Sequence, residues 1–209
     1  MLGKGPTQIS CDKKKKCDGM CPEGIVTLAV EVLNQGELIV YPTETLYGIG
    51  GKAHDLAIEE KILKAKKSPP DKKISVAYND LKQAEGYLEM ELPDLAWELE
   101  KHFLPGPLTL VIETDAATEG IRIPDHPIPQ KIIEKFGPIT STSANTHGMQ
   151  DPVTIESARF QLGADVKLYI DCGPCEYGDG STVVKVGKEL EILREGAIEE
   201  KEIGEKIGL

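Results

Sequence analysis

The sequence lacks any apolar run that approaches the roughly 18 residues of a membrane-spanning helix. Aromatic residues are scarce, at 5% of 209 positions with a single tryptophan, although hydrophobic residues make up 40% and suffice for a globular core. Residues 1–10 lack the apolar segment of a secretion signal. We therefore expect a cytoplasmic protein that does not associate with membranes.

The common nucleotide and hydrolase motifs are also missing. The chain has no GxxxxGK[ST] phosphate loop, and Gly48-Ile-Gly-Gly51 does not fit GxGxxG. It contains neither GxSxG nor HExxH. The sequence therefore supports no P-loop, no dinucleotide fold, and no serine or zinc hydrolase.

Five cysteines are an unsuitable number for a disulfide framework. Three of them crowd the N-terminus and two form a CxxC: Cys11, Cys17, Cys21, Cys172 and Cys175. They could bind zinc or form a pair, but the first spacing is wider than in usual zinc knuckles. We favour reduced, partly disordered thiols and predict no metal site.

The net charge of −11 argues against a surface coated for nucleic acid. Against this background, six lysines fall within thirteen residues: Lys61, Lys64, Lys66, Lys67, Lys72 and Lys73. Such a run is typical of a solvated helix face, and a phosphate-binding surface is the alternative.

The pattern of residues predicts one elaborated α/β domain. Residues 1–22 are polar and lysine-rich, which indicates a flexible arm, and residues 23–209 form the predicted domain. Helices are expected near 22–35, 56–67, 81–87, 92–103, 128–136 and 155–162, with a closing helix from 197. Strands are expected near 38–41, 74–78, 108–112, 121–123, 139–142, 166–170, 181–186 and 190–193. Alternation of helices with late strand-to-strand links predicts a mixed sheet.

The stretch Gly36–Gly51 is the centre of this prediction. An apolar strand ends at Pro42, and the glycines at 48, 50 and 51 permit close approach of a bulky group. Thr43, Glu44 and Thr45 are then polar groups held at the end of the strand. The alternative is an ordinary turn whose threonines cap the next helix. A second hydroxyl-rich turn, Ser141 to Asn145, repeats the design.

Hydroxyls, amides and cations at predicted strand ends suit an anionic substrate held by many hydrogen bonds. Phosphoryl or nucleotidyl transfer needs mainly positioning and charge neutralisation, so the lack of a nucleophilic triad is no objection. The candidates are Thr43, Thr45, Lys64, Lys66, Arg122, Ser141, Ser143, Asn145, Ser181 and Arg194.

Six short stretches in this order resemble the YrdC family, which comprises threonylcarbamoyl-adenylate synthases and YciO-type paralogues. They cover about residues 24–200. The stretches are Tyr41-Pro-Thr-Glu-Thr-Leu-Tyr-Gly-Ile-Gly50, Leu104-Pro-Gly-Pro-Leu-Thr-Leu-Val111, Ile121-Arg-Ile-Pro-Asp-His-Pro127, Ser141-Thr-Ser-Ala-Asn145, Gly180-Ser-Thr-Val-Val184 and Leu193-Arg194.

The resemblance implies a twisted open sheet of mixed parallel and antiparallel strands, flanking helices and a concave basic cavity. It implies that L-threonine, bicarbonate and ATP give threonylcarbamoyl-AMP and pyrophosphate for t6A modification of tRNA position 37. Mg²⁺ would accompany ATP. Further implied partners are tRNA or double-stranded RNA and a t6A transferase protein.

The resemblance also implies roles for individual residues. Lys66 and Arg122 would be catalytic, and Lys66 with the magnesium ion would neutralise phosphate charge. Threonine would contact Thr45, Arg122, Ser141 and Ser181. ATP would contact Lys66, Ser68, Thr118, Ser143, Asn145 and Arg194.

The chain departs from the synthase pattern after Lys66. The family's KxRP is Lys66-Lys67-Ser68-Pro69 here, so an arginine with its planar fork is replaced by serine. Lys72 and Ala77 occupy the later Asn and His positions of the motif, and Lys67, Lys72 or Lys73 could restore the charge but not the fork geometry. The alternatives to a synthase are a YciO-type paralogue that hydrolyses a threonylcarbamoyl linkage and a non-catalytic RNA-binding module.

Overall fold

The computed structural model describes residues 5–11, 23–115 and 117–208. Its centre is one ten-stranded sheet in the order β1-β8-β2-β3-β7-β4-β6-β5-β9-β10. The strands are β1 (Thr7–Ser10), β2 (Ile39–Tyr41), β3 (Gly48–Gly50), β4 (Ser75–Ala77), β5 (Leu108–Glu113), β6 (Thr118–Arg122), β7 (Ile139–Ser143), β8 (Leu168–Asp171), β9 (Thr182–Val186) and β10 (Leu190–Arg194). Parallel and antiparallel pairs both occur, which confirms the predicted mixed sheet.

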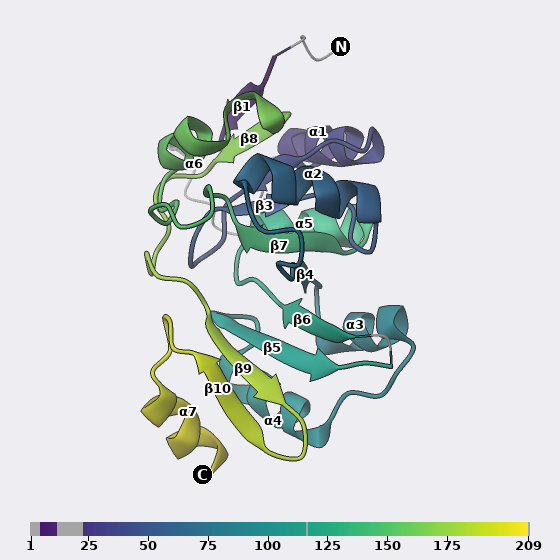
Figure 1. The fold of residues 1–209 in the computed structure, drawn as a ribbon, viewed down its shortest axis with the longest axis vertical. Coiled ribbons are helices and arrows are strands. Elements are labelled where there is room, and N and C mark those ends of the chain that lie inside the picture. The colour runs from purple at the N-terminus through teal and green to yellow at the C-terminus, as the bar shows by residue number, and fades with distance from the viewer. Residues whose placement is uncertain (1–4, 12–22, 116, 209) are drawn as a thin grey trace.

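The helices divide between the two halves of the sheet (Figure 1). They are α1 (Glu23–Asn34), α2 (Leu56–Lys66), α3 (Leu81–Leu88), α4 (Asp94–Phe103), α5 (Pro127–Phe136), α6 (Ile155–Leu162) and α7 (Glu200–Ile207), with a 3-10 turn at Gly163–Asp165. In the half that contains β1, α1 and α5 pack in one apolar cluster and α2 and α6 in another. That half is therefore covered on both faces.

The other half, from β6 to β10, has helices in one apolar cluster only. Alternate residues Leu108, Leu110 and Ile112 of β5 enter the core with α3, α4 and α7. Thr109 and Val111 point to the opposite face, because successive strand residues alternate in direction. This second face is the floor on which a polar site can form.

Local chemistry explains most helix boundaries. The Asp55 side chain accepts from the N–H groups of Ala57 and Ile58 and caps α2. Asp80 and Thr154 do the same for α3 and α6. Since α2 begins thirteen residues after Thr43 and is capped by Asp55, the alternative in which Thr43 and Thr45 cap it is wrong.

Strand β3 lies where the sequence pattern predicted only a turn. Its glycines fit because a Cβ at Gly50 would lie 2.7 Å from the Tyr41 ring, and one at Gly51 would lie 2.3 Å from Ile58 Cγ2. The bulky group that the glycines accommodate is therefore the protein's own core. The other predicted helices and strands agree with the structure to within a few residues.

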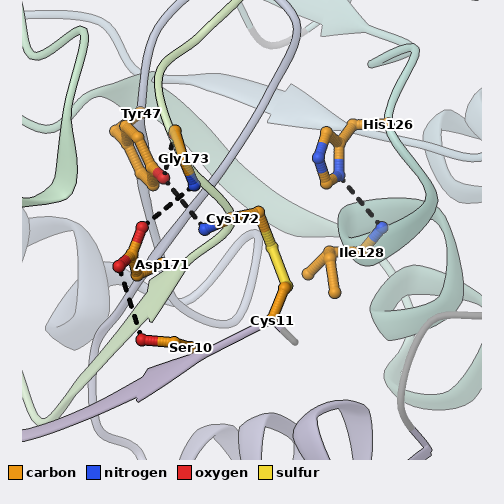
Figure 2. Close-up of a disulfide and its surroundings, with 8 residues drawn as sticks. All are labelled: Ser10, Cys11, Tyr47, His126, Ile128, Asp171, Cys172 and Gly173. Carbon is orange, nitrogen blue, oxygen red and sulfur yellow. Dashed lines mark hydrogen bonds between the residues drawn. A yellow bond between two sulfur atoms is a disulfide. The ribbon is translucent and has the colours of Figure 1, made fainter. Parts of the chain in front are cut away.

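The structure of residues 7–11 contradicts part of the prediction that residues 1–22 form a flexible arm. Thr7–Ser10 pairs in parallel with β8, and Cys11 forms a disulfide with Cys172 whose S–S distance is 2.05 Å (Figure 2). The ladder hydrogen bonds and the buried Cys11 bring residues 7–11 into the sheet. The prediction that these two cysteines are reduced is wrong, whereas Cys17, Cys21 and the rest of residues 12–22 lie outside the described part of the chain.

None of the helices in the described ranges is long and apolar enough to span a membrane.

Candidate active site in the cavity between the sheet halves

A cavity of about 240 Å³ lies between the open face of β5, β6, β9 and β10 and the loop that follows β2. Its wall comes from eight separate segments of the chain. The polar side chains that line it are Thr43, Thr45, Lys72, Lys73, Ser75, Thr109, Arg122, Ser141, Thr142, Ser143, Asp151, Ser181 and Arg194.

The charge of this wall is opposite to that of the whole chain. Four of the lining side chains are cationic and one, Asp151, is a carboxylate, while the net charge of the protein is −11. A concave wall of one sign concentrates ions of the other sign. The cavity therefore favours an anionic ligand.

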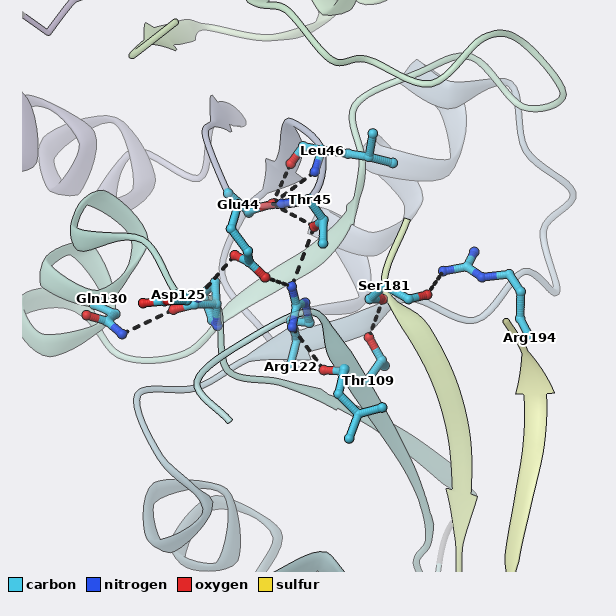
Figure 3. A network of polar contacts seen from close by, with 12 residues as sticks. Glu44, Thr45, Leu46, Thr109, Arg122, Asp125, Gln130, Ser181 and Arg194 are labelled. Carbon is cyan, nitrogen blue, oxygen red and sulfur yellow. Dashed lines mark hydrogen bonds and ion pairs between the residues drawn. The ribbon is translucent and has the colours of Figure 1, made fainter. Parts of the chain in front are cut away.

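Arg122 forms the floor of the cavity through a buried ion pair with Glu44 (Figure 3). Both side chains are 5% exposed. The Arg122 guanidinium also donates to Leu108 O at 2.9 Å, and Glu44 accepts from the Asp125 N–H at 3.0 Å. Burial lowers the pKa of Arg122, and Glu44 opposes that shift. A buried charge needs such partners, so Glu44 fixes the position of the guanidinium.

The loop after β2 is held by its own threonines. The Thr43 hydroxyl accepts from the N–H groups of Thr45 and Leu46, each at 3.2 Å. The hydroxyls of Thr43 and Thr45 lie 2.9 Å apart. Thr45 Oγ1 is also 3.5 Å from the Arg122 guanidinium, which joins this loop to the cavity floor.

Ser181 connects the floor to Arg194. Its hydroxyl lies 2.7 Å from Thr109 Oγ1, and its carbonyl accepts from Arg194 at 2.7 Å (Figure 3). A bulge places Arg194 there: Ile192 pairs with Val184, but Arg194 pairs with Val183, so two residues of β10 oppose one of β9. Without this bulge, Arg194 would share the core-facing side of Ile192.

Lys66 lies behind the wall and not in it. Its ammonium donates to Ser143 O, to Asn145 O at 2.9 Å and to Asn145 Oδ1 at 3.1 Å. The Ser143 hydroxyl donates to the same Asn145 Oδ1 at 2.6 Å. Burial lowers the pKa of Lys66 to about 8, and nearby Asp151 opposes the shift. This network orders the second hydroxyl-rich turn.

Six of the ten predicted site residues line the cavity: Thr45, Arg122, Ser141, Ser143, Ser181 and Arg194. Lys66 and Asn145 support that wall from behind. Ser68 and Thr118 are not part of the lining. The Ser68 hydroxyl is buried without a hydrogen-bond partner in the described ranges, and Thr118 is exposed at the other end of β6 from Arg122. The ligand that each residue contacts stays a prediction.

The predicted site omitted several residues that the fold brings to it. Glu44 lay inside the quoted Tyr41–Gly50 stretch, and its buried pairing with Arg122 needed knowledge of a contact across 78 positions. Thr109 stands opposite Arg122 in the β5–β6 register. No feature of the sequence pointed to Asp151. The dense lysine run pointed to Lys72 and Lys73.

The fold and cavity together define a mixed α/β protein with an anion-binding site between two halves of one sheet. The family described as telomere recombination, Sua5/yciO/yrdC, matches residues 31–196. The chain belongs to this family.

Individual relatives extend over most of the chain. A putative threonylcarbamoyl-AMP synthase of Mycobacterium tuberculosis is 38% identical over 197 residues, which cover 89% of this chain and 90% of the relative. Sua5 of Pyrococcus abyssi, solved in complex with L-threonine, superposes with a TM-score of 0.85 at 30% identity. That match covers 96% of this chain but 60% of the Sua5 chain. E. coli YciO superposes with a TM-score of 0.79 at 25% identity, with 97% and 99% of the two chains covered.

Proposed function

We propose that this protein is a threonylcarbamoyl-AMP synthase, which joins L-threonine, bicarbonate and ATP and releases pyrophosphate. The observation that carries the proposal is the convergence of Thr45, Arg122, Ser141, Ser181 and Arg194 on one basic cavity. The name of the M. tuberculosis relative and the threonine complex of P. abyssi Sua5 support it.

The chemistry of the wall suits the two halves of this reaction. Arg122 with the hydroxyls of Thr45 and Ser181 would bind the carboxylate and hydroxyl of threonine, and would hold its carbamate close to ATP. The carbamate oxygen would attack the α-phosphorus as pyrophosphate leaves. Fixed cations and hydroxyls stabilise the charge of such a transition state without a nucleophilic side chain.

Mg²⁺ would enter with ATP in this proposal. The described residues contain no cluster of three His, Cys, Asp or Glu side chains that could hold a metal alone. Asp151 is the single carboxylate among the lining residues, and one carboxylate is enough for an ion that is otherwise bound by phosphates and water. The ion would neutralise phosphate charge when bound.

The proposed product is the activated intermediate for t6A formation at tRNA position 37, in the cytoplasm. It would pass to a separate t6A transferase, which places tRNA and that protein among the proposed partners. Binding to double-stranded RNA by the protein itself is a weaker proposal, because the net charge of −11 opposes an extended phosphate-binding surface.

The test measures pyrophosphate release from ATP by the pure protein, with threonine and bicarbonate each omitted in turn. Release that requires both substrates is expected, and an Arg122→Gln variant should lose at least about a hundredfold in rate, as for other charged transition-state contacts. Pyrophosphate at background with all three substrates present contradicts the proposal.

A YciO-type activity is the second candidate. The observation that favours it is Ser68 in place of the family arginine, together with coverage of 99% of the E. coli YciO chain. Release of threonine from t6A-bearing tRNA by the pure protein would support this candidate. An intact modified base after long incubation would exclude it.

A further inference from the structure

The Lys66 ammonium has no hydrogen left for a ligand in the described structure. A lysine side chain has three N–H donors, and those of Lys66 are directed at Ser143 O, Asn145 O and Asn145 Oδ1. The side chain is also 6% exposed. Lys66 therefore orders the turn that contains Ser143, and another cation must neutralise the charge of a bound phosphate.

Two of the other lining cations are also engaged. Arg122 is neutralised by Glu44 and donates to Leu108 O as well. Arg194 donates to Ser181 O at 2.7 Å, although its planar group keeps further donors. Neither is a fully uncommitted charge.

Lys72 and Lys73 differ from these three cations. Both line the cavity, and within the described ranges neither ammonium has a hydrogen bond or ion pair. Lys72 is close enough to contribute to the lowered pKa of Lys66. Burial raises the pKa of Glu119, and the charge of Lys73 opposes that rise. Two ammonium groups that line one cavity without a hydrogen bond or ion pair repel each other, and an anion bound in that cavity offsets the repulsion.

We infer that Lys72 and Lys73, on the loop between α2 and β4, are the residues that bind the polyphosphate of ATP in this chain. The inference rests on the proposed function for the identity of the ligand. It explains two features together: the dense lysine run continues past the end of α2, and Ser68 occupies the place of the family arginine.

Lysine makes this a different kind of phosphate site from an arginine site. Each ammonium is a flexible point charge, whereas a guanidinium binds two phosphate oxygens in a fixed plane. The affinity should therefore depend on charge more than on geometry. Replacement of both lysines by arginine should preserve binding, and high salt should weaken it.

The test measures the affinity of ATP and of inorganic pyrophosphate by calorimetry, at low and at physiological salt. Lys72→Ala and Lys73→Ala should each weaken both ligands about fivefold to tenfold, and the double variant about thirtyfold or more. The double variant should also have a smaller dependence on salt. Lys64→Ala is the matched control, because Lys64 belongs to the same lysine run and is exposed on α2 outside the lining. It should bind within twofold of the unchanged protein.

Each outcome separates the inference from the proposed function. ATP and pyrophosphate bound through Lys72 and Lys73, without threonine-dependent turnover, would support the inference and refute the synthase. Turnover with unchanged ATP and pyrophosphate affinity in the double variant would refute the inference alone. Absence of binding of either ligand to the unchanged protein would also overturn it.

Discussion

The buried pair of Glu44 and Arg122 determines how the cavity floor is presented. Two charges at 5% exposure are stable together because each satisfies the other. Asp125 N–H donates to Glu44 and Leu108 O accepts from Arg122, while the guanidinium keeps further N–H donors. A guanidinium held in this way cannot turn away when no ligand is bound. Glu44 therefore holds the Arg122 guanidinium in the position from which it can bind an anion in the cavity.

Glu44→Gln should destabilise the protein, because it leaves the Arg122 charge buried without a counter-charge. We expect a loss of about 3 kcal/mol in the free energy of unfolding, as for other buried pairs with one partner removed. Chemical denaturation measures it. The double variant Glu44→Gln/Arg122→Met should recover part of this loss. A change below about 0.5 kcal/mol in Glu44→Gln would show that the pair is not energetically coupled.

His126 makes the stability of helix α5 depend on pH. Its Nδ1 accepts from the Ile128 N–H at 3.2 Å and so caps the first turn. Protonation would remove this acceptor. Burial also lowers the pKa of His126 from 6.5 to about 4.

Because the folded protein binds this proton less readily than the unfolded chain, stability is full above pH 6.5 and falls as the pH drops toward 4. The loss from this group should be about 1–2 kcal/mol after allowance for its partial exposure. His126→Asn retains a capping oxygen and cannot titrate, so its stability should change less between pH 6.5 and 5. The neighbouring carboxylates Asp125 and Glu44 are present in the unchanged protein and in the His126→Asn variant, so their titration does not distinguish the two. Identical pH profiles would contradict the prediction.

At the scale of elements, sequence patterns predict most helices and strands but miss those that depend on tertiary contacts. The amphipathic spacing in α1 and the apolar run of β5 are local, so both were predicted. Strand β3 consists of Gly48, Ile49 and Gly50, a composition that disfavours strands. It forms because the glycines pack against Tyr41. Strand β1 lies in a polar segment and depends on pairing with β8, 161 residues away.

The site divides in the same way. Residues in the quoted family stretches were found, as Thr45, Ser143 and Ser181 show. The family resemblance placed Arg194 at the site, but local alternation did not, because strict alternation along β10 directs it to the core side with Leu190 and Ile192. The bulge that reverses it is visible only in the pairing of Arg194 with Val183.

The disulfide between Cys11 and Cys172 fastens β1 to the end of β8. Loss of the cross-link by Cys11→Ser should lower the free energy of unfolding by about 2–4 kcal/mol, because it closes a long loop in the unfolded chain. Added reductant should destabilise the unchanged protein by a similar amount and leave the variant unaffected. Denaturation with and without reductant measures both effects. Cys175→Ser is the control, because Cys175 is a free thiol in the described structure. Equal effects of reductant on the unchanged protein and on Cys11→Ser would contradict the prediction.

At the scale of the molecule, the cavity lies between two halves of the sheet that differ in how many of their faces helices cover. The half with β1 is covered on both faces by helices, whereas the half from β6 to β10 leaves one face for the site. Thr45, Ser141 and Ser143 come from the first half, and Thr109, Arg122, Ser181 and Arg194 from the second. A ligand in the cavity therefore contacts both.

ATP should stabilise the two halves together. A ligand that binds only the folded state adds about 2.7 kcal/mol of stability at a hundred times its dissociation constant. Hydrogen exchange with and without ATP should therefore slow both in the loop at 43–48 and in β9 and β10, since the wall comes from both. Lys72→Ala/Lys73→Ala should show a smaller effect in both regions at the same ATP concentration, and Lys64→Ala should match the unchanged protein. Protection confined to one half would mean that ATP binds outside the cavity, because residues of both halves line the cavity.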